Sequence, residues 1–223
     1  MFPISIDLEL NALAPDLALG VISASSVEVT QNDVALWGQL DGTVAQVQSE
    51  MRLEELPTIP EIKALREAYR TLGKDPSRYR GSQEALLRRI LQGKGLYKIN
   101  TVVDINNLVS LESRHSVGSY NMGRLKPPIV FRKGKPEESY KGIGKETINI
   151  AGLPVFADEL GPFGSPTSDS ERAMITTDTQ SMLMVIISFT GSQLLCRHID
   201  RAKALLSTYA KHHGQFIETA IIK

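Results

Sequence analysis

The hydrophobic residues near the start of the chain occupy every second position. This alternation runs from Ile4 to Leu10 and predicts a half-buried strand. Residues 17–30 are mostly apolar and predict a second strand, with residues 11–16 as the turn between the two. The chain is therefore expected to open with two neighbouring strands.

Further along, apolar residues recur at three- and four-residue spacing, which predicts amphipathic helices. Thr30 or Asn32 is placed to cap the first helix, and Ser82 is placed to cap the third. Gly73 and Gly93 end the second and third helices, because glycine readily adopts the left-handed conformation that follows a helix. The predicted helices cover residues 37–51, 62–72, 83–92, 101–111 and 194–209.

In the second half of the chain, short apolar runs alternate with turns. The run SMLMVIISF at residues 181–189 is almost entirely apolar, which predicts a central strand buried on both faces. Residues 158–173 lack periodicity and predict a long loop. Because helices and strands mix without βαβ regularity, the expected fold class is α+β, with mixed sheets and packed helices. The other predicted strands are residues 129–133, 146–150, 153–157 and 215–223.

Charge is unevenly distributed between the two ends of the chain. The 223 residues carry 25 basic and 25 acidic side chains, yet residues 1–55 hold nine acids and a single base. The net charge is therefore −8 in that part and +8 in the remainder. This asymmetry indicates either an anionic partner for the later part or solvated charge without a function.

Two prolines, Pro57 and Pro60, mark a linker between the acidic and the basic part. We therefore divide the chain into an acidic N-terminal α/β portion, residues 1–60, and a core, residues 61–223. The two parts are expected to pack as one unit.

Composition also limits the cellular setting. The single cysteine, Cys196, excludes an intrachain disulfide and a cysteine-based zinc site, and its position predicts a buried structural thiol. No apolar run approaches the roughly 18 residues of a membrane span. The first residues lack the basic region of a signal peptide. We expect a cytoplasmic protein with no membrane partner.

The common motifs of catalysis and cofactor binding are missing. The chain has no P-loop, no GxGxxG after a strand and no GxSxG elbow. His198, His212 and His213 lack the HExxH spacing, and neighbouring histidines on a helix end point apart. We therefore expect neither a metal nor a cofactor.

A basic segment runs from Pro76 to Lys98, where six basic side chains face one acid, Glu84, for a local net charge of +5. Such a segment can contact several phosphates of a nucleic acid. The alternative is a helix face with solvated charges. The candidate tRNA-binding residues are Arg78, Arg80, Arg88, Arg89, Lys94 and Lys98.

Two adjacent asparagines, Asn106 and Asn107, lie inside the helix predicted after this segment. Asparagine is a poor residue for a helix interior because its amide competes with backbone hydrogen bonds. The pair either faces a ligand pocket or belongs to a buried polar network. Ser119 and Tyr120 follow Gly118 at a predicted turn, where small residues would leave room for a ligand.

The stretch RYRGSQEALLRRILQGKGLYKINTVVDINNLVSLESRHSVGSYNMGRL resembles the core of the B3/B4 domain, and ITTDTQSMLMVI at residues 175–186 resembles a later segment of it. This domain is the editing module of the phenylalanyl-tRNA synthetase beta subunit and also occurs as free-standing proteins. The resemblance implies an α+β fold, tRNA or aminoacyl-tRNA as a partner, and hydrolysis of a mischarged aminoacyl ester.

Residue by residue, the resemblance is partial. The family's pocket asparagine falls on Asn107, and the threonine before it becomes Asn106. The pocket histidine falls on Gly118 and the acidic residue of the later segment falls on Val185, which argues against recognition of tyrosine. Asn107 would then be the catalytic amide, helping backbone donors near Gly118 to stabilise an oxyanion. The other expected pocket residues are Asn100, Asn106, Gly118, Ser119, Tyr120, Thr179 and Gln180.

Three interpretations follow. In the first, a free-standing domain binds aminoacyl-tRNA or its aminoacyl end and hydrolyses mischarged species in trans. In the second, the same fold is a non-catalytic module that binds RNA or a small molecule. In the third, it is an interaction domain that uses the fold as a scaffold, since fold does not fix function.

Overall fold

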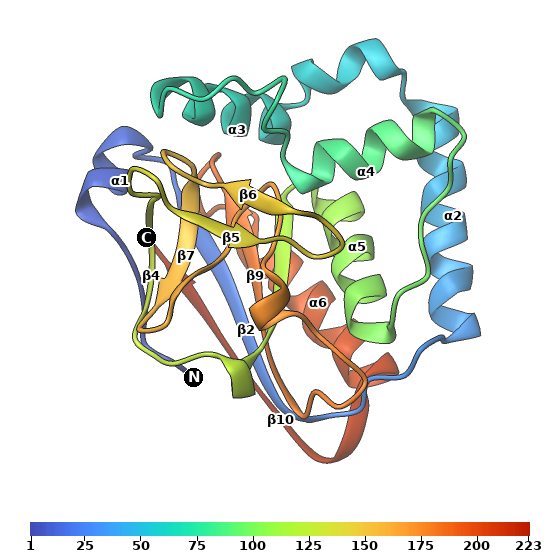
Figure 1. Cartoon of the computed structure of the whole chain (residues 1–223). Coiled ribbons are helices and arrows are strands. Elements are labelled where there is room, and N and C mark those ends of the chain that lie inside the picture. Colours follow the sequence, from blue (N-terminus) through green and yellow to red (C-terminus); the bar gives the residue numbers. More distant parts are fainter.

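Two four-stranded sheets pack face to face, and helices cover the outer face of one of them (Figure 1). This computed structural model describes residues 1–223, except for the side chain of His212. The arrangement confirms the predicted α+β class with mixed sheets.

The central sheet has the strand order β10-β2-β9-β3, and all its neighbours are antiparallel. Its strands are β2 (Ala18–Val27), β3 (Ser116–Asn121), β9 (Ser181–Ser188) and β10 (Lys211–Ile222). In the second sheet, with the order β1-β4-β7-β8, only β1 and β4 run parallel. Its strands are β1 (Ile4–Ile6), β4 (Ile129–Lys133), β7 (Pro154–Asp158) and β8 (Gly161–Gly164). A separate hairpin pairs β5 (Ser139–Lys141) with β6 (Thr147–Asn149).

The two faces of the central sheet belong to two different hydrophobic clusters. On β2 and β9, Ile22 and Met184 pack toward the helices, whereas Val21 and Val185 pack toward the second sheet. Side chains alternate between the faces of a strand, so a strand covered on both faces must be apolar at consecutive positions. This explains the apolar run in β9 and confirms its predicted central place.

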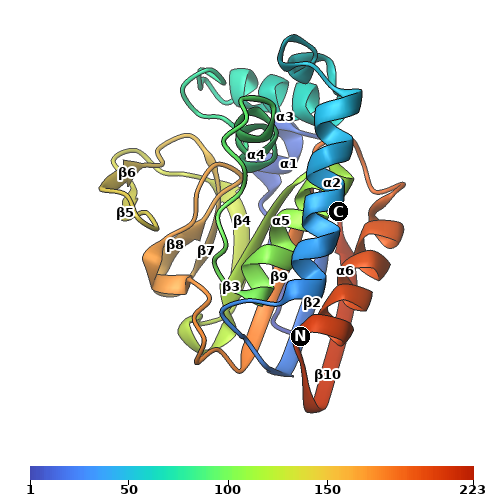
Figure 2. The ribbon, with the colours of Figure 1, turned by 90° about the vertical axis from the view of Figure 1, so that its right-hand side faces the viewer.

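Helices α2, α4, α5 and α6 cover the helix side of the central sheet, and α1 and α3 contribute to the cluster between the sheets. Figure 2 shows α2, α5 and α6 on one side of the molecule and the β5–β6 hairpin on the other. Three short 3₁₀ helices lie at Leu53–Thr58, Met122–Arg124 and Glu171–Ala173. The α-helices are α1 (Leu8–Leu13), α2 (Val34–Glu50), α3 (Pro60–Thr71), α4 (Ser82–Leu91), α5 (Thr101–Ser113) and α6 (Leu195–Tyr209).

The predicted first strand is wrong beyond Ile6. The side chain of Asp7 accepts the backbone N–H groups of Glu9 and Leu10, which starts helix α1, and Leu8 is exposed to solvent. The expected turn at residues 11–16 does not form a hairpin either. Strand β1 pairs with β4, more than 120 residues later, instead of with β2.

Two of the predicted helix caps are also wrong. Helix α2 is capped by Asp33, which accepts the backbone N–H of Leu36 at 2.8 Å, instead of by Thr30 or Asn32. Helix α4 has Gly81 at its cap position, without a side-chain cap from Ser82.

By contrast, the predicted helix ends are confirmed, because Gly73 and Gly93 have φ angles of 78° and 72°. The expected linker at Pro57 and Pro60 is ordered: Leu56 is buried in the 3₁₀ helix before it, and Pro60 is the first residue of α3.

Three further expectations are corrected. The turn expected at Gly118–Tyr120 is strand β3, held at the sheet edge by β9. The loop expected at residues 158–173 contains β8 and a 3₁₀ helix. Cys196 is exposed, because it lies in the first turn of α6 away from the buried stripe.

Candidate nucleic-acid interface

Five of the six basic residues singled out in the sequence line one hollow of about 400 Å³, which we call the basic hollow. Helix α4 and the residues before and after it provide these five. The β5–β6 turn adds Lys145, and the loop after β8 adds Thr167. In Figure 1 the β5–β6 hairpin extends toward the region below α4. The lining side chains are Arg78, Arg80, Ala85, Arg88, Arg89, Gln92, Lys94, Lys145 and Thr167.

The core positions the walls of the basic hollow. Leu87 and Ile90 bury one face of α4, which leaves Arg88 at the edge of that face and Arg89 on the opposite side of the helix. On the opposite wall, the hydroxyl groups of Thr167 and the buried Tyr69 hydrogen-bond at 2.7 Å. Burial raises the pKa of Tyr69 well above its ordinary value, so this hydroxyl stays protonated at neutral pH. Helix α4 therefore carries two of the basic side chains, and the segments that flank it and the β5–β6 turn carry the other four.

One acid, Glu84, lies beneath the basic hollow. Its side chain is 1% exposed, and both oxygens accept from Arg66 at 3.0 Å. Arg88 donates from Nε to the same carboxylate at 2.9 Å, and Arg80 lies 3.9 Å from it. Because Glu84 is shared among these guanidinium groups, it neutralises only part of their charge.

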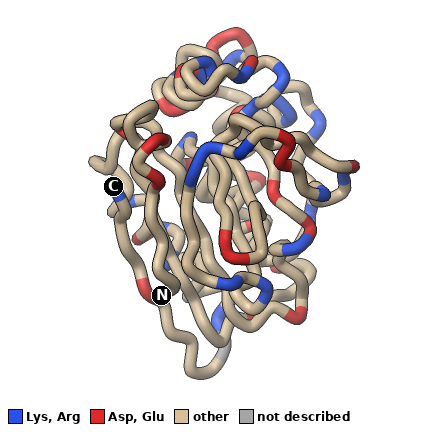
Figure 3. The backbone as a smooth tube through the Cα atoms, turned by 60° about the vertical axis from the view of Figure 1, so that its left-hand side comes forward, with Lys and Arg blue, Asp and Glu red and all other residues tan. Residues whose placement is uncertain are grey.

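The basic hollow concentrates positive charge in a chain that is neutral as a whole. Its lining includes six basic side chains and no acid. Figure 3 shows that basic and acidic residues are mixed along the rest of the backbone. Arg78 has a side chain that is 84% exposed and only a 3.9 Å contact with Asp75. The Arg78 guanidinium is therefore free to meet an anion from solvent.

The sixth residue, Lys98, lies outside the basic hollow. Its Nζ atom is 4.7 Å from the ring centroid of Trp37, a cation–π contact. The indole of Trp37 donates to Asp104 at 2.7 Å. Burial raises the pKa of Asp104, against the lowering effects of this hydrogen bond and of Lys98. Lys98 therefore has a partner within the fold.

The asparagines of α5 differ from one another. Asn100 caps the helix: its Oδ1 accepts the backbone N–H of Val103 at 3.0 Å, and its amide donates to the carbonyl of Ile175 at 3.5 Å. Asn106 has a buried Oδ1 that finds no hydrogen-bond partner among the described residues. Asn107 is half-buried, and its side chain has no hydrogen bond to the described part of the chain.

The region around Gly118 is filled by a neighbouring side chain. A Cβ atom at Gly118 would come within 2.2 Å of the hydroxyl oxygen of Tyr120, and one at Gly164 within 2.3 Å. The Tyr120 hydroxyl donates to the buried Asp169 at 2.9 Å. Burial raises the pKa of Asp169 to about 7. Ser119 is half-buried, and the alternation of side chains along β3 turns it to the face opposite that of Tyr120. The room expected beside Gly118 is thus occupied by the Tyr120 ring.

Thr179 and Gln180 lie elsewhere, in a polar hollow of about 830 Å³ between residues 25–30 and 177–181. Gly118 pairs with Val185 across β3 and β9, five positions along the strand from Gln180. At roughly 3.3 Å per residue, this is about 17 Å. The structure therefore does not bring all the expected pocket residues together.

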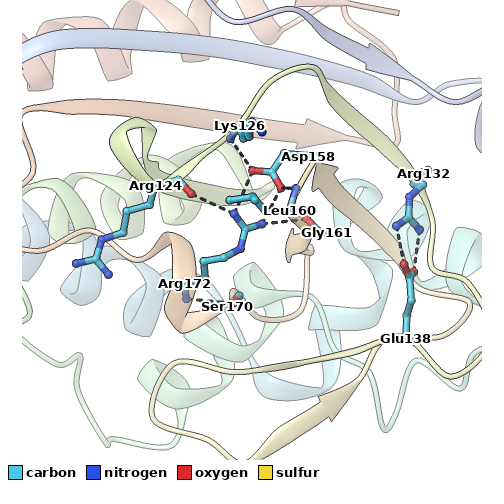
Figure 4. Close-up of polar contacts among 9 residues, drawn as sticks. All are labelled: Arg124, Lys126, Arg132, Glu138, Asp158, Leu160, Gly161, Ser170 and Arg172. Atoms are coloured by element: carbon cyan, nitrogen blue, oxygen red, sulfur yellow. Dashed lines mark hydrogen bonds and ion pairs between the residues drawn. The ribbon is translucent and has the colours of Figure 1, made fainter.

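A second arginine cluster lies at the end of the sheet that contains β7 and β8 (Figure 4). Arg172 donates to both carboxylate oxygens of Asp158, at 2.9 and 3.1 Å, and the side chain of Asp158 is fully buried. Arg172 also donates to the carbonyls of Gly161 and Arg124. Nearby, Arg132 makes a bidentate pair with Glu138 at 2.7 and 2.8 Å. These guanidinium groups serve the fold.

Sequence reasoning missed Lys145 and Thr167 of the basic hollow, because only packing brings them to α4. It also passed over Tyr97, whose ring lies 3.8 Å from the guanidinium of Arg89. The alternation of basic and aromatic residues in KGLYK, residues 94–98, was the available signal.

No group of three potential metal-binding side chains lies together in the described part of the chain, which leaves out the side chain of His212. No helix of the described chain is both long enough and apolar enough to span a membrane.

Comparison with known proteins places this geometry in a family. A curated relative, the phenylalanine–tRNA ligase beta subunit of Dechloromonas aromatica, is 28% identical over 100 residues, which cover 44% of this chain and 13% of that protein. An N-terminal fragment of the phenylalanyl-tRNA synthetase beta subunit from Pyrococcus horikoshii aligns with 99% of this chain and 50% of the fragment, at 14% identity and a TM-score of 0.45. The chain thus spans a small part of that relative and half of the fragment. The family model of the B3/4 domain matches residues 64–211, about two thirds of the chain, and the chain therefore belongs to the B3/4 domain family.

Proposed function

We propose that this B3/4 domain binds tRNA or aminoacyl-tRNA, and that the basic hollow holds the phosphate backbone near the acceptor end. The observation that carries the proposal is the convergence of Arg78, Arg80, Arg88, Arg89, Lys94 and Lys145 on one hollow without an acid in its lining. The family relation to the phenylalanyl-tRNA synthetase beta subunit supports tRNA as the nucleic acid. We place this function in the cytoplasm, where charged tRNA is used.

The physical argument is the release of counterions. A protein that neutralises several phosphates releases condensed cations, so binding weakens as salt rises, by roughly 0.7 to 0.9 log units per phosphate for each log unit of salt. Arginine also offers two parallel donors to a phosphate, which fixes its orientation. Binding should therefore be modest in affinity and strongly dependent on salt.

A double variant of exposed residues, Arg78→Gln with Lys94→Gln, tests the proposal. Neither residue has a close acidic partner in the described chain, so stability should not change. We expect tRNA affinity at low salt to fall about tenfold and the salt slope to decrease by about 2. The readout is fluorescence anisotropy with labelled tRNA.

The matched control is Lys203→Gln with Lys211→Gln, which removes the same charge from exposed positions on α6 and β10 outside the basic hollow. An equal loss in both double variants would refute the basic hollow as the binding site.

Phosphate contacts carry no sequence information, so loss of Arg88 and Arg89 should lower the affinity for all tRNAs alike. The measurement is a panel of tRNAs bound to the Arg88→Gln/Arg89→Gln variant. A changed order of preference among the tRNAs would contradict the role of these residues as phosphate ligands.

A second candidate function is hydrolysis of mischarged aminoacyl-tRNA in trans. The observation in its favour is the uncommitted amide of Asn107, together with the buried Asn106 Oδ1 that finds no hydrogen-bond partner among the described residues. An aminoacyl ester is already activated, so an oriented water and an oxyanion donor can accelerate its hydrolysis. The amide of Asn107 would be that donor.

A deacylation assay with a panel of correctly and wrongly charged tRNAs tests this candidate. Hydrolysis of one mischarged species that is lost in Asn107→Ala would support it. The absence of hydrolysis across the panel, with tRNA still bound, would leave the non-catalytic binding module as the function.

A further inference from the structure

Tyr97 lies exposed beside the basic hollow, in the segment that joins α4 to α5. Its side chain is 64% exposed and belongs to neither hydrophobic cluster. A large aromatic ring in water gains nothing from core packing, but it offers a flat face to a ligand. This segment has no regular secondary structure, and Gly93 and Gly95 both have positive φ angles that turn it sharply.

Arg89 joins this ring to the basic hollow. Its guanidinium lies 3.8 Å from the Tyr97 ring centroid and also lines the basic hollow. The same group donates to the carbonyl of Lys94 at 3.3 Å, while its Nε has no hydrogen-bond partner in the part of the chain that the structure describes. One face of the ring is thus covered by an arginine of the phosphate site, and the high exposure of the side chain leaves the remainder open.

We propose that Tyr97 stacks an unpaired base whose flanking phosphates lie in the basic hollow, so that the site selects single-stranded RNA. This inference rests on the proposed function, since it requires phosphates in the basic hollow. Every base has a π-face that can stack on an aromatic side chain, and a neighbouring arginine strengthens such a stack. Bases inside a duplex are already stacked on one another and present only their edges. The unpaired 3′ end of a tRNA has this chemistry.

The test uses the full chain and three fluorescein-labelled probes: a single-stranded RNA of twelve nucleotides, the same sequence as a duplex, and the same strand with abasic residues. The variants are Tyr97→Leu, which removes the ring, and Tyr97→Phe, which keeps it. Anisotropy at low salt gives each affinity.

We expect Tyr97→Leu to weaken binding of the single strand about tenfold and to leave the duplex and the abasic strand within about twofold. Tyr97→Phe should bind all three probes like the unmodified chain. Equal affinity of Tyr97→Leu and the unmodified chain for the single strand would overturn the proposal. An equal loss on all three probes would overturn it as well, because the ring would then act without a base.

The Arg78→Gln/Lys94→Gln variant separates this result from failure of the proposed function. If that variant loses affinity for all three probes while Tyr97→Leu loses none, the basic hollow binds RNA and only the stacking proposal falls. If the unmodified chain binds no RNA, the proposed function and the stacking proposal both fail.

Discussion

The basic hollow and the cluster around Arg172 are both rich in arginine, but their guanidinium groups are used differently. Arg172 meets both oxygens of Asp158 and two backbone carbonyls, and the side chain of Asp158 is fully buried (Figure 4). In the basic hollow, Arg78 meets only a distant carboxylate, 3.9 Å away, and its side chain is 84% exposed. The guanidinium of Arg172 stabilises the protein, whereas that of Arg78 is available to a ligand.

The difference shows that the number of basic residues in a segment does not identify a binding surface. What identifies it is the number of donors that remain after the fold has used its share. A guanidinium with several internal acceptors gains little from an external phosphate. A guanidinium that faces solvent breaks no internal hydrogen bond when it binds a phosphate. Each prediction below changes one side of this comparison.

The largest effect is expected for Arg172→Ala. The substitution leaves the buried carboxylate of Asp158 without its guanidinium, and removal of one partner of a buried ion pair costs about 3–5 kcal/mol. Urea denaturation should show this loss in the free energy of unfolding. RNA affinity of the folded fraction should be unchanged, because Arg172 does not line the basic hollow.

Arg132→Ala is the matched control. Each carboxylate keeps backbone hydrogen bonds after its arginine is lost, but the Glu138 side chain is 20% exposed and that of Asp158 is not, so a smaller loss of about 1–2 kcal/mol is expected. Equal losses in the two variants would show that burial of the acid does not set the cost.

The next largest effect is expected in the pH dependence of stability, because Asp169 is a buried carboxyl group without a guanidinium partner among the described residues. Burial raises its pKa to about 7, against lowering contributions from the Tyr120 hydroxyl and Lys145. In the unfolded chain its pKa is about 3.9. The folded state therefore binds the proton more tightly, and this contribution is fully present below about pH 4 and is lost as the pH rises through 7.

The measurement compares the unmodified chain with Asp169→Asn, which keeps an acceptor for Tyr120 but cannot ionise. Urea denaturation from pH 5 to 8 should show the unmodified chain losing about 2.5 kcal/mol relative to the variant, because the rest of the loss occurs below pH 5. Other titrating groups largely cancel in this difference. A difference independent of pH would mean that Asp169 titrates at the same pH in both states.

Local patterns predicted the parts of the fold that depend on local causes. Gly73 and Gly93 end helices because of their own backbone freedom. The apolar run of β9 indicates a strand covered on both faces. The strand expected through Leu8 and Leu10 was wrong because Asp7 offers the backbone a helix cap that competes with alternation. Strand β3 was missed because its formation depends on pairing with β9, more than 60 residues later.

The candidate site was predictable to a similar extent. The basic cluster from Arg78 to Lys94 lies within one short segment, so its charge is visible in the sequence. Lys145 and Thr167 could not be foreseen, because the packing of the β5–β6 hairpin and of the loop after β8 brings them to α4. Nor could the sequence show that Glu84, the lone acid of the segment, is buried beneath the arginines.

Glu84 links the two sides of the comparison, and Glu84→Gln should produce the smallest effects, with opposite signs. The fold loses a carboxylate shared by Arg66 and Arg88, so the free energy of unfolding should fall by about 2 kcal/mol. The same change releases Arg88 and Arg80 and removes a negative charge beneath the basic hollow, so the local net charge rises by one. RNA affinity at low salt should therefore rise by about threefold, as expected for one more available cation near a phosphate backbone.

The control for this variant is Glu67→Gln, which makes the same charge change at an exposed position on α3. Among the described residues, the only ion pair of Glu67 is a 3.9 Å contact with Lys63. Its stability should change by less than about 0.5 kcal/mol, since exposed pairs contribute little, and its RNA affinity should not rise. Weaker RNA binding in a folded Glu84→Gln protein would contradict the comparison. It would mean that Glu84 holds Arg80 and Arg88 in the orientation that binds RNA, so that a guanidinium can serve the fold and the ligand together.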